Sequence, residues 1–222
     1  MTIALGVLVS GSGSNLQAII DRVREGSLDA DIRLVIANKP DAQGLERARQ
    51  AGIPTACVRH ADFPVREDFD RELVRLLQAA EVEFVALAGF MRILTAEFLA
   101  PFAGRVVNIH PSLLPACAGL RAQGQQADHG VRLAGCTVHF VDEQMDHGPI
   151  IIQAAVPAFA DDDENTLGAR ILDLEHRIYP QALQWIAQGR VRVRGRQVEV
   201  LGAACTVGSL WANPPLETPF DS

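Results

Sequence analysis

The chain has 222 residues, of which 48% are hydrophobic, and its formal net charge is −7. That length supports one substantial core and about one domain, and the acidic balance disfavours non-specific nucleic-acid binding, which depends on basic surface. No apolar run is long enough to cross a bilayer, and the first apolar segment lacks the flanks of a secretory signal. We therefore expect a soluble, cytoplasmic protein that binds neither membrane nor nucleic acid.

Apolar segments alternate with amphipathic ones through the first half of the chain. The pattern predicts strands over 3–9, 32–37, 55–58, 84–88 and 105–109, and helices over 15–25, 44–51, 65–80 and 95–99. This alternation is typical of an α/β fold with a doubly wound, mostly parallel twisted sheet and right-handed crossovers, which is a Rossmann-like N-terminal half.

The pattern changes after a loop predicted over 112–124. Two strand-like runs, 136–141 and 150–156, follow with only a short connection, which predicts an antiparallel extension of the sheet edge. A helix is expected over 164–188, with a bend near Pro180, and a hairpin over 191–201. We expect one catalytic domain over residues 1–202 and a Pro-rich tail over 203–222.

A Gly/Ser-rich turn, Ser10-Gly11-Ser12-Gly13-Ser14-Asn15, joins the first strand to the first helix. Free N–H groups at a helix start, together with the helix dipole, favour an anion there. A dinucleotide fingerprint would have a third glycine where Leu16 stands and an acid where Asn38 stands, and no Gly-Lys-Ser/Thr follows for a Walker loop. The turn therefore predicts a monophosphate site. The alternative is an ordinary strand–helix turn with Ser14 as N-cap.

Asn108 and His110 stand two residues apart at the end of an apolar run, just before a loop with two prolines. In an extended chain both side chains point to the same side. An imidazole can move protons near neutral pH and an amide NH2 can hold a developing oxyanion, so the pair suits transfer of an acyl-type group. The alternative is a strand end whose polar groups only satisfy the loop backbone.

Three strings carry a family resemblance: Asn108-Ile109-His110-Pro111-Ser112-Leu113-Leu114-Pro115, Gly135 to Val141, and Asp146 to Gln153. Over about Ile3 to Gly189 the chain resembles the folate-dependent formyltransferases. It is most similar to the branch that transfers the formyl group of 10-formyltetrahydrofolate to the amine of glycinamide ribonucleotide in de novo purine biosynthesis. The resemblance implies a formyltransferase-like fold, an enzyme, and two small-molecule substrates, with the folate as cosubstrate.

The resemblance also implies a catalytic set of Asn108, His110 and Asp146. Asp146 lies in the turn before Gly148-Pro149, where its carboxylate would favour the protonated imidazole. Without the resemblance, Asp146 is better explained as an Asx-turn residue. His139 is expected to be a packed, hydrogen-bonded side chain, and His147 a solvated one.

Substrate and cofactor contacts are implied by the same resemblance. The phosphate of the ribonucleotide is expected at Gly13, Ser14 and Asn15, and Glu175 near its amine, although Glu175 alone suggests a helix-surface carboxylate. The folate pocket is expected to involve Arg66, Met91, Arg92, Ile93, Leu94, Asn108 and Val141. Without the resemblance these arginines suggest solvated side chains, and the apolar residues suggest core.

The four cysteines are scattered, with no Cys-x-x-Cys, at Cys57, Cys117, Cys136 and Cys205. That spacing disfavours a zinc knuckle or a disulfide scaffold and fits a reducing compartment. No His-Glu-x-x-His occurs either, so we expect no metal site. Cys117 lies in the expected active loop, where an incidental thiol is the simpler interpretation.

The loop after the catalytic strand departs from the family pattern. The family usually carries Pro where the chain has Ala118, often His where it has Arg121, and Gln-Ala-Leu where it has Gln125-Gln126-Ala127. Losing a proline frees the chain by roughly 0.4–1 kcal/mol, and a lost buried leucine removes an anchor. We therefore predict a mobile loop over 115–130 without ligand.

Two alternatives stay open and a third is disfavoured. In a formyltetrahydrofolate hydrolase, water replaces the amine, and an N-terminal regulatory domain is expected that the strand starting at Ile3 leaves no room for. A methionyl-tRNA formyltransferase is disfavoured, because it would be expected to add a basic C-terminal domain, for which this acidic sequence ends too soon. A catalytically weak folate or nucleotide binder is kept open by the altered loop. We expect a monomer or a homodimer.

Overall fold

The computed structural model describes residues 1–203, so the predicted tail lies outside the described residues except for Ala203. Seven strands form one sheet in the order β3-β2-β1-β4-β5-β6-β7. Their bounds are β1 Ile3–Val9, β2 Ala30–Ala37, β3 Thr55–Cys57, β4 Phe84–Leu87, β5 Val106–His110, β6 Leu133–Phe140 and β7 Ile150–Pro157. Strands β1 to β5 are parallel and β6 and β7 are antiparallel, which confirms the predicted mixed α/β sheet.

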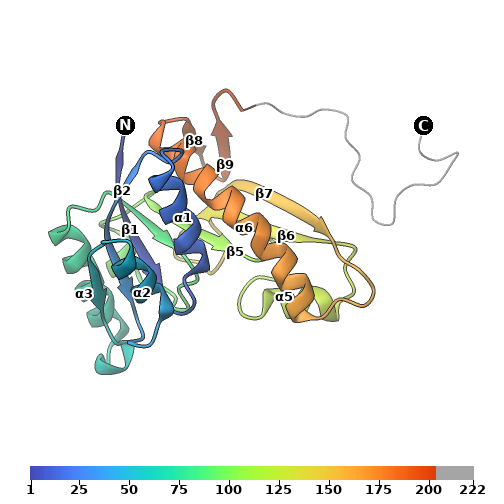
Figure 1. Cartoon of the computed structure of the whole chain (residues 1–222), viewed down its shortest axis with the longest axis horizontal. Coiled ribbons are helices and arrows are strands. Elements are labelled where there is room, and N and C mark those ends of the chain that lie inside the picture. The colour runs from blue at the N-terminus through green and yellow to red at the C-terminus, as the bar shows by residue number, and fades with distance from the viewer. Residues whose placement is uncertain (204–222) are drawn as a thin grey trace, which may run out of the picture.

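Helices cover both faces of this sheet (Figure 1). They are α1 Ser14–Arg24, α2 Gln43–Gln50, α3 Arg66–Ala79, α4 Ala96–Leu99, α5 Ala122–Asp128 and α6 Glu164–Ala187, with a 3-10 turn at His60–Asp62. A separate hairpin follows, with β8 Val191–Arg194 and β9 Gln197–Val200, as the sequence predicted. None of the helices in residues 1–203 is long and apolar enough to cross a membrane.

Successive residues of β1 face two different cores, because side chains alternate along a strand. Val7 and Val9 pack in the core that holds residues of α1, α2 and α6, whereas Leu8 packs in the core that holds residues of α3 and α4. Burial on both faces explains why the β1 sequence is a continuous apolar run.

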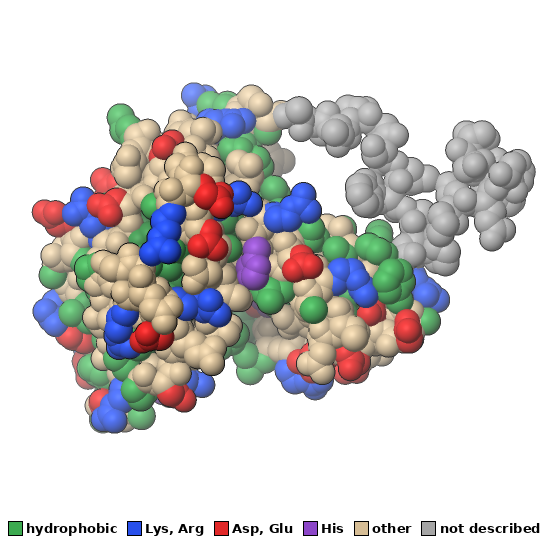
Figure 2. Space-filling model, viewed as in Figure 1, with side chains coloured by type: hydrophobic (Ala, Val, Ile, Leu, Met, Phe, Trp, Pro, Cys, Tyr) green, Lys and Arg blue, Asp and Glu red, His purple; other side chains and the backbone are tan. Residues whose placement is uncertain are grey.

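Acidic and basic side chains are interspersed over the face of the molecule seen in Figure 2.

Helix α6 is fastened to the centre of the sheet by Tyr179. This side chain is fully buried, and its hydroxyl lies 3.0 Å from the carbonyl oxygens of both Leu87 and Val107. At the start of the helix, Asp163 accepts hydrogen bonds from the backbone of Asn165 and Thr166 in a capping box. The helix therefore holds a defined rotation that brings Glu175 toward α1.

Helix α5 was not predicted, since its residues fall across the end of the loop expected over 112–124. Its seven residues include Gly124 and Asp128, which are poor helix formers. Tertiary contacts with α6 and β6 stabilise it, and local pattern does not reveal those contacts. The mobility expected for residues 115–130 stays a prediction.

Candidate active site

Asn108 and His110 end β5 and project together, with Asn108 half-buried and His110 buried. Antiparallel pairing with β6 puts His139 opposite Asn108 and Thr137 opposite His110. The extended backbone that made the two side chains candidates therefore also selects their neighbours across the strand pair.

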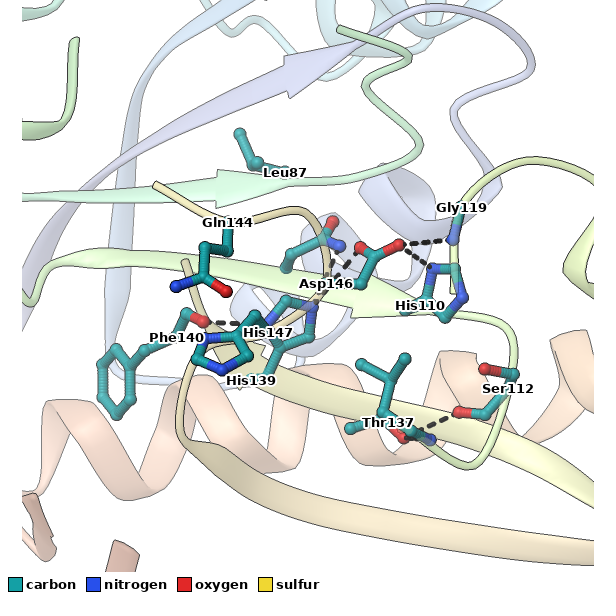
Figure 3. Close-up of polar contacts among 12 residues, drawn as sticks. Leu87, His110, Ser112, Gly119, Thr137, His139, Phe140, Gln144, Asp146 and His147 are labelled. Atoms are coloured by element: carbon teal, nitrogen blue, oxygen red, sulfur yellow. Dashed lines mark hydrogen bonds and ion pairs between the residues drawn. The ribbon is translucent and has the colours of Figure 1, made fainter. Parts of the chain in front are cut away.

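Asp146 reaches His110 from the connection between β6 and β7. Its Oδ2 lies 3.4 Å from His110 Nδ1 and accepts a hydrogen bond from the Gly119 backbone at 2.8 Å. Figure 3 shows this carboxylate between the His110 side and the His139 side of the site. The backbone φ of Asp146 is 52°, which lies in the left-handed region that Asp tolerates better than most residues. The Asx-type contact in this turn is made by Asp142, which accepts from Gln144 N, rather than by Asp146.

His139 is the packed, hydrogen-bonded side chain that the sequence suggested, but it also belongs to the site. Its Nδ1 lies 2.7 Å from the Phe140 carbonyl and so donates to it, which leaves Nε2 to accept from Asn108 Nδ2 at 3.3 Å. Burial lowers the pKa of His139, so the neutral ring that this arrangement requires is favoured. His139 therefore orients the Asn108 amide, and the second N–H of that amide is left available to donate a hydrogen bond.

Both ring nitrogens of His110 face oxygen acceptors. Nε2 lies 3.0 Å from the Cys117 carbonyl, on the opposite edge of the ring from Asp146. An imidazole with a hydrogen on each nitrogen satisfies both contacts. The Cys117 thiol takes no part in them, which fits the incidental thiol expected from the sequence.

A cavity of about 800 Å³ opens beside these residues. It is lined by every residue expected for the folate pocket: Arg66, Met91, Arg92, Ile93, Leu94, Asn108 and Val141. Leu94 is also part of the core, whereas Met91 and Ile93 are more than half exposed. Arg66 donates to the Ile93 carbonyl at 2.7 Å and so holds this segment against α3.

Exposed apolar side chains gather at this cavity. Eight large hydrophobic residues are exposed among residues 1–203, and four of them, Met91, Ile93, Leu120 and Met145, line it. Exposed apolar groups concentrated at one hollow are typical of ligand-binding sites, which makes this cavity the candidate site. The site thus combines apolar walls with the polar groups of Asn108, His110 and Arg92.

The Gly/Ser-rich turn packs tightly against α2. Gly13 is the N-cap of α1, with φ at 69°, and a Cβ there would lie 2.5 Å from the Gly44 Cα. Only glycine fits both the conformation and the space. Ser14 is the first helical residue, so its alternative role as N-cap is wrong.

Glu175 is buried, which corrects the helix-surface assignment made from the residue alone. It is 5% exposed and accepts from Asn15 Nδ2 at 2.7 Å. Burial raises the pKa of Glu175 to about 7. Helical spacing could have found it, since Glu175 stands four residues after Ile171 and four before Tyr179, both of which are core residues. The structure thus joins Asn15 of the turn directly to α6.

The sequence also raised His147, a metal site and the cysteines as candidates. The His147 side chain is 43% exposed and pairs with Asp142, as expected of a solvated residue. Within residues 1–203, no cluster of three or more His, Cys, Asp or Glu side chains could hold a metal ion. Cys57, Cys117 and Cys136 are free thiols, and burial raises the pKa of Cys136 to about 12. Cys205 lies outside the described residues.

Several known proteins are similar to this chain in both sequence and fold. A family model described as formyl transferase matches residues 3–183. The trifunctional purine biosynthetic protein adenosine-3 of Drosophila melanogaster is 53% identical over 83% of the chain, which spans only 14% of that protein's length. Phosphoribosylglycinamide formyltransferase of Escherichia coli (strain K12) is 48% identical over 84% of this chain and 88% of its own.

The structural comparison agrees with the sequence comparison. Glycinamide ribonucleotide transformylase 1 from Symbiobacterium toebii superposes with a TM-score of 0.89 and is 51% identical, covering 90% of this chain and 94% of its own. The family match extends over most of the chain and includes β5, β6 and the connection that carries Asp146. The chain therefore belongs to the formyl transferase family.

Proposed function

We propose that the chain transfers the formyl group of 10-formyltetrahydrofolate to the amine of glycinamide ribonucleotide, a step of de novo purine biosynthesis. The observation that carries this proposal is the meeting of Asn108, His110 and Asp146 at the wall of one cavity. The relatives named for this reaction and the fold shared with them support the choice of substrates.

Asn108 and His110 would stabilise the charge that develops on the formyl oxygen. The second amide N–H of Asn108 is free to donate once His139 has taken the first. One such donor typically contributes about 2.7–4 kcal/mol to the transition state. Acid–base assistance from a positioned imidazole such as His110 is worth about 10²–10⁴-fold in rate.

In the reaction, a bond forms between the substrate amine and the formyl carbon, and the bond from that carbon to the folate nitrogen breaks. The attacking amine loses a proton and the folate nitrogen gains one. His110 Nε2 is the ring nitrogen suited to assist, because Asp146 occupies the other side of the ring. The formyl oxygen would replace the Cys117 carbonyl as the acceptor of that N–H.

The cavity fits a flat, heteroaromatic ligand with a charged tail. Met91 and Ile93 offer apolar contact, and Arg66 and Arg92 offer positive charge on the same wall. Outside the lining of this cavity, Gly13, Ser14 and Asn15 would receive the substrate phosphate at the start of α1. Glu175, which accepts from Asn15, would lie near the substrate amine. No metal is required by this chemistry. Cytoplasmic location and a monomeric or homodimeric state stay predictions.

The decisive experiment supplies 10-formyltetrahydrofolate with glycinamide ribonucleotide and, separately, with water alone. We expect loss of the folate formyl group only when the amine is present, together with formylated ribonucleotide detected by mass spectrometry. Equal loss in both mixtures would instead identify a hydrolase. Binding of both ligands without any loss would identify a catalytically weak binder and refute the proposal.

A further inference from the structure

Gln126 is a polar side chain buried where α5 meets the sheet. It is only 3% exposed. Its Nε2 donates to the carbonyls of Pro111 at 2.8 Å and Ala122 at 3.0 Å. Its Oε1 accepts from the Gly135 backbone at 3.4 Å. One amide therefore joins the exit of β5, the first turn of α5 and strand β6.

The contact with Pro111 is the one that bears on chemistry. Pro111 follows His110 directly, and its carbonyl belongs to the Pro111–Ser112 peptide, the first peptide group after the one that joins His110 to Pro111 at the end of β5. Farther along the loop, Thr137 holds the Ser112 carbonyl at 2.7 Å, and Gln153 holds the Leu114 carbonyl at 2.9 Å. Gln126 thus anchors this loop at Pro111, the residue that follows His110 in the chain.

Burial makes these contacts obligatory. An amide removed from water is unfavourable unless its hydrogen bonds are formed, and backbone carbonyls left unpaired in the same place are unfavourable as well. Gln126 and Pro111 therefore hold each other in one arrangement. A hydrocarbon side chain of equal length would fill the space without fixing the peptide.

We propose that Gln126 is a positioning residue for the transfer reaction: it fixes the Pro111 peptide and thereby the direction in which His110 presents its ring to Asp146 and to the cavity. This inference rests on the proposed function. Misplacing a reacting group by about 1 Å can cost roughly 10²-fold in rate, so we expect kcat to fall about 10- to 100-fold when the amide is removed.

The test compares Gln126→Met, which keeps the length of the side chain and loses its hydrogen bonds, with Asp128→Ala on the exposed face of the same helix. In the Met variant kcat should fall while KM for both substrates stays within about threefold, at a temperature where circular dichroism shows the protein fully folded. The Asp128 variant should keep wild-type kcat. A folded Met variant with wild-type kcat would overturn the proposal.

A second variant separates positioning from stability. In Gln126→Glu only the protonated carboxyl can donate to Pro111, so kcat relative to wild type should recover as pH falls through the pKa of the introduced group. A ratio that does not change with pH in the folded protein would count against the proposal. Failure of both variants to fold would also overturn it, because Gln126 would then serve the fold alone.

A spectroscopic readout keeps the inference separate from the proposed activity. In protein labelled with 15N histidine, the His110 Nε2–H that donates to Cys117 should shift or broaden in Gln126→Met and remain unchanged in Asp128→Ala. Absence of amine-dependent transfer in the wild type would refute the proposed function, while the His110 signal would still decide the role of Gln126. An unchanged His110 signal in the Met variant would overturn that role.

Discussion

Glu175 should make the protein less stable as pH rises, and Glu175→Gln should remove that effect. The carboxyl is 5% exposed and its pKa is raised from 4.5 to about 7 because burial disfavours the charged form. In the unfolded chain the group ionises near its ordinary pKa, so the unfolded state loses its proton first. The contribution of this carboxyl to the free energy of unfolding is therefore fully present below pH 4.5, and that contribution is lost as pH rises through about 7.

The size of the effect follows from the same rise in pKa. At 1.36 kcal/mol per pKa unit, the contribution amounts to about 3 kcal/mol at pH 8. Glutamine stays neutral, and it can donate to Asn15 Oδ1, which is buried and has no hydrogen-bond partner, while still accepting from Asn15 Nδ2. We expect Glu175→Gln to be about 3 kcal/mol more stable than wild type at pH 8, and about 1 kcal/mol or less more stable at pH 5.

Urea denaturation at both pH values measures this difference directly, because the other shifted groups are common to the two proteins and cancel. Glu67→Gln, an exposed change on α3, provides the matched control and should show no gap that depends on pH. A gap of equal size at pH 5 and pH 8, or a less stable Gln variant at pH 8, would refute the argument from burial.

Three further changes test the site and its frame. His110→Ala should lower kcat by about 10²–10⁴-fold in a formyl-transfer assay, with folate affinity by calorimetry little changed; wild-type turnover would remove the mechanism. Asn108→Ala should lower kcat by about 10²–10³-fold without a matching rise in KM, which steady-state kinetics can separate. Gly13→Ala should lower Tm by roughly 4–8 °C in a thermal melt, because the left-handed backbone costs a residue with a Cβ about 2 kcal/mol and that atom would meet Gly44. An unchanged Tm would show that the turn relaxes without cost.

Periodicity predicted the elements whose apolar faces are long and regular. The strands that surround β5 and the helix that contains Tyr179 follow the expected positions closely, since burial dictates their residue pattern. Helix α5 escaped prediction because its stability comes from contacts such as Gln126 with Gly135, which join residues from separate elements. Helix propensity depends on the local sequence alone, so it cannot predict a contact between separate elements.

Part of the candidate site could likewise be predicted from the sequence, and part could not. Asn108 and His110 could be paired from the sequence because a strand places residues i and i+2 on one side. The role of His139 could not, because it depends on the register of β6 against β5, which sets His139 rather than a neighbour opposite Asn108. A slip of one residue would turn His139 to the other face of the sheet and leave the Asn108 amide without its partner.

Sheet register also explains why the candidate site lies at the end of β5. Strand β4 ends at Leu87, which pairs with Asn108, so β5 continues for two residues beyond its neighbour on that side. On the other side, β6 still pairs with it as far as His110. The end of β5 is therefore rigid yet open above β4, where residues of the following segment, including Met91, line the cavity. Extending β4 by two paired residues would close this opening, so the shortness of that strand is as much a part of the site as the side chains are.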